Sequence, residues 1–141
     1  AHRKAWVINQ MINDDVMELA RYMEEGAKIV PVQCKERFIE RDNDEQICAV
    51  CALGAVAVAI TAETHGHLES MTAFSYYDYI SNRIDHEFNV LDMKVANPMK
   101  MNSITGQYLV EELSQVIEYL NDHCNWPIPR IAAWLRELAR K

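Results

Sequence analysis

The chain has 141 residues, half of them hydrophobic and a quarter charged, with a formal net charge of −7. This length suits a single domain, and the low numbers of glycine and proline, four of each, argue against a β-sandwich, a barrel or a long disordered linker. A nucleic-acid-binding protein needs a basic patch to neutralise phosphates. The basic residues concentrate at residues 130–141, where they are typical of a helix C-terminus. We therefore expect no nucleic-acid partner.

The opening segment, AHRKAWVINQM, lacks the apolar stretch of about 7–15 residues that a secretory signal needs. This favours a cytoplasmic protein whose four cysteines, at positions 34, 48, 51 and 124, are reduced thiols. The longest uncharged run, residues 47–62, is shorter than the roughly 20 residues that cross a bilayer. We therefore expect no membrane partner.

The first predicted element is an amphipathic helix. Asn13 or Asp14 could cap it and Gly26 could end it. Residues 28–40 break the helical period, and Pro31 favours extended backbone. The sequence therefore allows one short extended segment near residues 29–39. The apolar positions that define the helix recur on one helical face: Ile12, Val16, Leu19, Ala20 and Met23.

The uncharged run over residues 47–62 (ICAVCALGAVAVAITA) predicts a helix that is apolar on every side. Such a helix must be buried, because no face of it meets water favourably. Gly54 destabilises a helix by about 1 kcal/mol relative to alanine, but it lies among the alanines at positions 52, 55, 57 and 59. This composition predicts that neighbouring helices approach closely.

Three further helices are predicted. Aromatic and aliphatic residues follow a helical period over residues 74–91, and a second such pattern covers residues 109–120. Residues 92–106 between them show little periodicity and contain the turn signal Asn97-Pro98, so a long connecting loop is expected. A last helix should begin at Pro127 or Pro129. The predicted fold is a single all-α domain over residues 1–141, with about five helices around residues 47–62.

Cys48, Cys51, His65 and His67 have a spacing that superficially matches a zinc finger. A helix over residues 47–62 would separate the cysteines from the histidines by roughly 20 Å, too far for one ion. The two cysteines also lack a neighbouring cation that would activate a redox pair. We predict no metal. No phosphate-binding or dinucleotide-binding glycine motif occurs in the sequence, so no cofactor is predicted.

Cys51, Asp122 and His123 supply the residue types of a thiol enzyme: a nucleophile, a base and a residue that orients the base. The competing interpretation is structural. Asn121 and Asp122 stand where one helix ends, and their side chains could bond the free backbone groups there. We favour the structural interpretation and predict no catalytic residue.

Tyr76, Tyr79 and Arg83 share a face of the predicted helix over residues 74–91. Tyrosine and arginine are enriched at interface hot spots, so this face is a candidate interaction site. Packing against another helix of the same domain is the alternative.

Two short motifs carry a resemblance: Cys-Ala-Leu-Gly-Ala at residues 51–55 and Leu-Asn-Asp at residues 120–122. The chain is similar over residues 45–140 to a family of small uncharacterised helical domains that are frequent in bacteriophage and bacterial genomes. There a helix of the first type is likewise followed by a Leu-Asn-Asp helix junction. The resemblance implies a small cytoplasmic accessory protein and allows a phage-encoded one.

These observations predict a small accessory or regulatory protein that acts through protein–protein contacts, with another protein or as a homo-oligomer. The face formed by Tyr76, Tyr79 and Arg83, or the 92–106 segment, would make the contact. The alternative is a cysteine-dependent hydrolase or transferase that uses Cys51 with His123.

Overall fold

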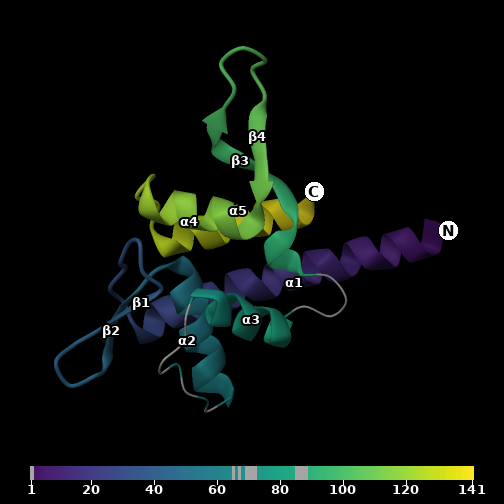
Figure 1. The fold of residues 1–141 in the computed structure, drawn as a ribbon. Coiled ribbons are helices and arrows are strands. Elements are labelled where there is room, and N and C mark those ends of the chain that lie inside the picture. Colours follow the sequence, from purple (N-terminus) through teal and green to yellow (C-terminus); the bar gives the residue numbers. More distant parts are fainter. Residues whose placement is uncertain (1, 65, 67, 69–72, 85–88) are drawn as a thin grey trace.

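A computed structural model describes residues 2–64, 66, 68, 73–84 and 89–141. Within these residues the chain forms five α-helices, one 3-10 helix and two antiparallel two-stranded sheets (Figure 1). The predicted all-α class is therefore wrong, although the number of α-helices in the described part agrees with the prediction. In chain order the elements are α1 (His2–Ile29), β1 (Ile39–Arg41), β2 (Ile47–Val50), α2 (Ala52–Thr64), α3 (Ala73–Ile84), η1 (Val90–Asp92), β3 (Lys94–Met101), β4 (Tyr108–Glu112), α4 (Leu113–Asp122) and α5 (Ile128–Arg140).

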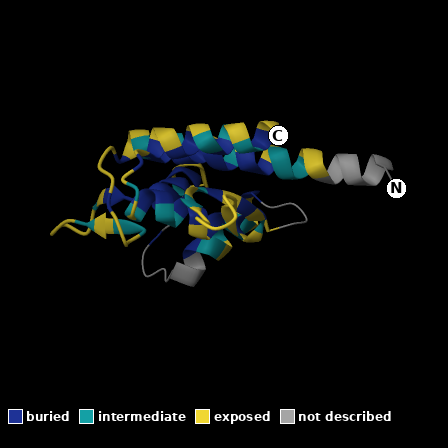
Figure 2. Cartoon of the chain, turned by 90° about the horizontal axis from the view of Figure 1, so that it is seen from above, coloured by how far each residue is buried: buried dark blue, intermediate teal, exposed yellow. Residues whose placement is uncertain are grey.

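The long helix α1 and the C-terminal helix α5 lie side by side and run antiparallel (Figure 2). α1 also packs against α2, and Gly26 lies at this crossing. A Cβ atom at Gly26 would stand 1.8 Å from the carbonyl oxygen of Ala55, so only glycine lets the two backbones approach so closely. The prediction that Gly26 ends the first helix is wrong, because α1 continues to Ile29.

The apolar run over residues 47–62 divides into a strand and a helix. Residues Ile47–Val50 form β2, which pairs with β1 across the turn at residues 42–46. α2 begins at Ala52 and is buried from there to Ile60, so the predicted buried central helix exists but starts five residues later. The first residues of the run differ from the prediction because a short apolar segment fits a buried strand as well as a buried helix.

Gly54 provides a close approach, as predicted, but not to a helix. A Cβ atom at this position would lie 1.7 Å from the carbonyl oxygen of Phe38, in the segment that leads into β1. The same segment supplies the extended backbone expected near residues 29–39: Gln33 forms a parallel bridge with Val50, and β1 begins at Ile39.

The predicted 92–106 loop is replaced by a β-hairpin. β3 and β4 pair antiparallel and project from the helical body (Figure 1). Leu109 was predicted to begin a helix but belongs to β4, and α4 starts only at Leu113. The hairpin is the main reason that the chain is mixed α/β.

The remaining boundaries are closer to expectation. α3 ends at Ile84, and the predicted continuation to residue 91 runs through residues 85–88, which lie outside the described part. α5 begins directly after Pro127, with Pro129 in its first turn, as predicted. Over the described ranges, none of the helices combines the length and hydropathy that crossing a bilayer requires.

Candidate functional site

The two motifs that carry the family resemblance meet at the side chain of Asn121, which is only 1% exposed. Its Oδ1 accepts hydrogen bonds from the backbone N–H of Ala52 (3.0 Å) and from Nε2 of Gln33 (2.8 Å). Its Nδ2 donates to the carbonyl of Cys34 (2.9 Å) and to Oδ1 of Asp122 (2.8 Å). A buried amide whose hydrogen-bonding groups are satisfied in this way rigidifies its surroundings. Asn121 therefore ties the end of α4 to the start of α2.

Asp122 extends this network to the segment before β1. Its Oδ1 also accepts the backbone N–H of Glu36 (3.0 Å), a residue held at a positive φ of 63°. A positive φ is unfavourable for a residue with a side chain, so the bond helps to hold the loop in this conformation. Asn121 and Asp122 thus bond backbone groups of distant segments rather than of their own helix end.

Cys51 is the last residue before α2, and 7% of it is exposed. Its Sγ accepts the backbone N–H of Gly54 (3.3 Å), which is the bond of a helix N-cap. Burial raises the pKa of the Cys51 thiol to about 12, so the thiol is protonated at neutral pH. A protonated thiol is a poor nucleophile.

A cavity of about 130 Å³ lies beside Cys51, with Asp122 in its wall. His123 does not line it. His123 is exposed at the end of α4, its ring 5.3 Å from that of Tyr119, and lines a neighbouring groove with Lys100. The structure thus brings Asp122 to the thiol but directs His123 to another surface, an arrangement that does not favour the thiol-enzyme alternative.

Of the four residues whose spacing matches a zinc finger, the structure describes only the two cysteines. Cys48 lies on β2 and is exposed, whereas Cys51 is buried. His65 and His67 lie outside the described residues. Among the residues that are described, no group of three or more His, Cys, Asp or Glu side chains is arranged to hold a metal ion.

The cysteines allow a direct test of the thiol-enzyme alternative. When the native protein is treated with iodoacetamide near pH 7, we expect Cys48 to be alkylated first. Cys51 should react at least about 100-fold more slowly, because it is buried and its pKa is raised to about 12. Cys34, buried with a pKa raised to about 11, should also be protected. Peptide mass spectrometry measures each rate. Alkylation of Cys51 as fast as that of Cys48 would support the enzyme instead.

The face formed by Tyr76, Tyr79 and Arg83 packs largely against the rest of the chain. Tyr76 is 4% exposed and its ring stacks on that of Phe38, with centroids 4.7 Å apart. The hydroxyl of Tyr79 lies 3.0 Å from Oγ1 of Thr61 on α2. These contacts favour the core-packing interpretation of the two tyrosines over the interface.

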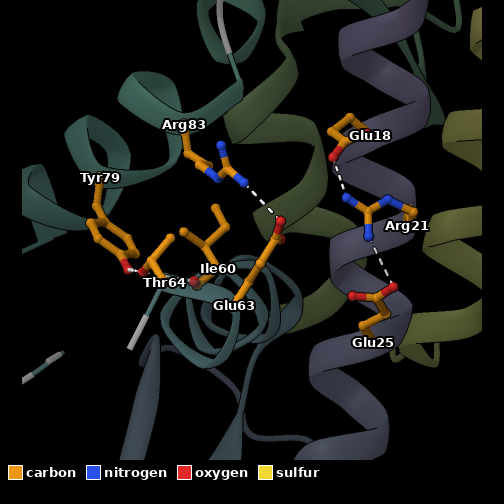
Figure 3. A network of polar contacts seen from close by, with 8 residues as sticks. All are labelled: Glu18, Arg21, Glu25, Ile60, Glu63, Thr64, Tyr79 and Arg83. Carbon is orange, nitrogen blue, oxygen red and sulfur yellow. Dashed lines mark hydrogen bonds and ion pairs between the residues drawn. The ribbon is translucent and has the colours of Figure 1, made fainter. Parts of the chain in front are cut away.

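Arg83 is exposed but also directed to α2. Its Nη2 donates to Oε1 of Glu63 at 2.7 Å (Figure 3). The figure also shows Tyr79 pointing to Thr64, whose Oγ1 lies 3.3 Å from the tyrosine hydroxyl. Of the three predicted residues, Arg83 alone keeps substantial surface for a partner.

The β3–β4 hairpin carries much of the exposed apolar surface. Ile104, at its tip, is 92% exposed, and Val110 on β4 is 63% exposed. Of the nine large hydrophobic residues exposed in the described part, six lie between residues 99 and 110: Met99, Met101, Ile104, Tyr108, Leu109 and Val110.

Two carboxylates on β4 are neutralised within the hairpin. Glu111 accepts Nδ2 of Asn97 (2.8 Å) and Nζ of Lys100 (3.1 Å), and these partners, Asn97 foremost, hold the pKa of Glu111 below its ordinary value. Glu112 lies 3.8 Å from Nζ of Lys94. The hairpin therefore presents apolar side chains without an unpaired carboxylate on β4.

No protein-family model, curated protein or solved structure matches this chain. The resemblance to the phage and bacterial family therefore stays a prediction, as does a phage origin.

Proposed function

We propose that this is a small accessory or regulatory protein that acts through protein–protein contact, and that the β3–β4 hairpin makes the contact. The observation that carries this proposal is the apolar character of the hairpin's solvent side. Side chains alternate between the two faces of a strand, and Val95 is buried on the face toward the body. The other face carries the exposed residues Ala96, Met101, Tyr108 and Val110, and at its base the pair Lys94 and Glu112.

The exposed face of this hairpin is more apolar than the exposed face of an ordinary antiparallel sheet. An antiparallel sheet with one wet face usually places polar side chains on that face. A two-stranded hairpin alone in water is also only marginally stable. An apolar hairpin that projects into solvent is therefore best explained by a partner that covers it.

The base of the hairpin is well anchored, so that the apolar surface is presented in a defined position. Val95 and Asn97 are buried, and Oδ1 of Asn97 accepts the backbone N–H of Met99 (2.9 Å). Nζ of Lys100 lies 4.2 Å from the centre of the Tyr119 ring on α4, a cation–π contact. A rigid anchor lowers the entropy that is lost when a partner binds.

Co-purification from the native host tests the proposal. We expect the triple variant Met101→Ser/Tyr108→Ser/Val110→Thr to lose at least about ten-fold of the bound partner, because apolar anchors dominate binding energy. The matched control, Met17→Ser/Ile29→Ser/Val32→Thr, changes three hydrophobic residues exposed elsewhere and should keep the partner. Circular dichroism verifies that both variants fold. A folded hairpin variant that retains its partner at full strength would contradict the proposal.

A further inference from the structure

We propose that the partner of the hairpin is a second copy of this chain, joined to the first by antiparallel pairing of the two β4 edges. The result is a four-stranded sheet in the order β3-β4-β4-β3. This inference rests on the proposed function, because it requires that the hairpin is the contact surface.

The outer edge of β4 offers unpaired backbone groups. The N–H of Leu113 bonds to the carbonyl of Met93, and that of Asn102 bonds to the carbonyl of Gln107, each at 2.8 Å. Along an antiparallel strand, the residues whose N–H and C=O groups point to the paired strand alternate with residues whose groups point away from it. Because Gln107 and Leu113 bond to β3, Tyr108 and Val110 direct their N–H and C=O groups away from β3. No strand in the described part pairs with this edge.

The outer edge of β3 is blocked. Its register with β4 is interrupted between Ala96 and Met101, and Pro98 in the interruption has no N–H to donate. Bulges and prolines are the devices by which proteins keep an edge strand from pairing. β4 has neither, so a second strand would add to β4.

The β4 sequence is complementary to itself when two copies pair around Val110. In that register Val110 faces its own copy, Leu109 faces Glu111, and Tyr108 faces Glu112 of the second chain. No carboxylate faces another, and each is already near a lysine of its own hairpin. Pairing around Glu111 would instead oppose two identical charges, which is unfavourable.

The backbone groups also match in this register. The two Val110 residues would exchange both N–H···O bonds. Beyond them, Tyr108 would lie opposite Glu112 of the second chain, whose carbonyl accepts the first bond of α4 because Glu112 is the N-cap. The N–H of Glu112 is held by Oε1 of Gln115 (3.4 Å), so the pairing ends where α4 begins. Residues directly opposite lie on the same face, so the apolar faces of the two hairpins become continuous.

Sedimentation velocity over a range of concentrations tests the inference. We expect the full chain to form a dimer, and Val110→Pro to raise its dissociation constant at least about ten-fold, because proline removes the outward N–H but none of the bonds to β3. The matched control is Ala96→Pro, which removes the outward N–H from the opposite edge and should leave the dimer intact.

Disulfide trapping gives a second measurement that does not depend on a proline variant folding. In a Cys48→Ser background, Val110→Cys should form a disulfide with its own copy, because directly opposed residues in such a pair lie about 5.5 Å apart. Ala96→Cys should not. A chain that is monomeric up to about 1 mM, or a dimer that is not trapped at position 110, would overturn the inference. In that case the co-purification experiment decides the proposed function. If the triple hairpin variant no longer binds a partner other than this chain, the proposed function stands. If it loses no partner at all, the proposed function fails together with the inference.

Discussion

Replacement of Asn121 by alanine is expected to lower the free energy of unfolding by about 3–5 kcal/mol. The change removes four hydrogen bonds at a position that is 1% exposed. It leaves the N–H of Ala52 and the carbonyl of Cys34 without the amide that they bond. Each buried polar group without a partner costs about 1–3 kcal/mol. Urea denaturation followed by circular dichroism measures the loss.

The matched control is Asn82→Ala, which removes an asparagine that is exposed on α3. Substitutions at such surface positions usually change stability by no more than about 0.5 kcal/mol. If Asn121→Ala and Asn82→Ala destabilise the protein equally, the Asn121 network does not join α2 to α4 in solution.

Gly54→Ala is the second change with a large expected effect. Alanine has the higher helix propensity and would add about 1 kcal/mol of stability in an open helix. Here its Cβ would lie 1.7 Å from the carbonyl oxygen of Phe38, and a backbone atom cannot rotate out of the way as a side chain does. We expect the steric overlap to dominate, with a net loss of about 3 kcal/mol or more.

Gly66→Ala is the matched control for this steric argument. A Cβ atom at Gly66 would meet its nearest neighbour, the hydroxyl oxygen of Tyr79, at 3.4 Å, which is an ordinary contact. Its thermal unfolding midpoint should stay near that of the unaltered protein, whereas that of Gly54→Ala should fall. A Gly54→Ala protein as stable as the original would show that Phe38 and α2 do not touch.

The helices were the predictable part of this fold, because their apolar residues repeat at helical spacing. Val16, Leu19 and Met23 were predicted to lie on one face, and the structure buries all three. The pattern is visible in the sequence because only one face of such a helix contacts the core, so apolar residues recur at helical spacing. The boundaries were less predictable: Ile47 and Val50 are β-branched and form β2, yet they adjoin an apolar helix without any polar break.

The β3–β4 hairpin could not be recognised from its period. Pro98 argues against a strand, and it is accommodated only because the strand is irregular there. Leu109 stands at helical spacing from Leu113 by coincidence, which extended the predicted helix backwards. The usable signal was the run from Tyr108 to Val110, whose aromatic and β-branched residues favour a strand, following Gly106 at a positive φ of 70°.

The contacts of the candidate sites were predictable only in part. Asn121 bonds to Ala52, 69 residues earlier in the chain. A local sequence pattern cannot indicate a contact between residues so far apart in sequence. The family resemblance singled out both motifs but did not show that they touch. The interaction site was predicted either on α3 or in the 92–106 segment. On α3, Tyr76 is buried against Phe38. Aromatic residues at helical spacing suit a core and an interface equally well.

The hairpin leaves the body between η1 and α4, while the packing of α1 against α5 and α2 lies elsewhere (Figure 1). Residues 101–110, from the end of β3 into β4, are all exposed, so their side chains can change without disturbing the packed helices. Insertions at exposed turns are likewise well tolerated. Under the proposed function, partner choice and folding are therefore encoded by largely separate residues, so that the first can change while the second is preserved.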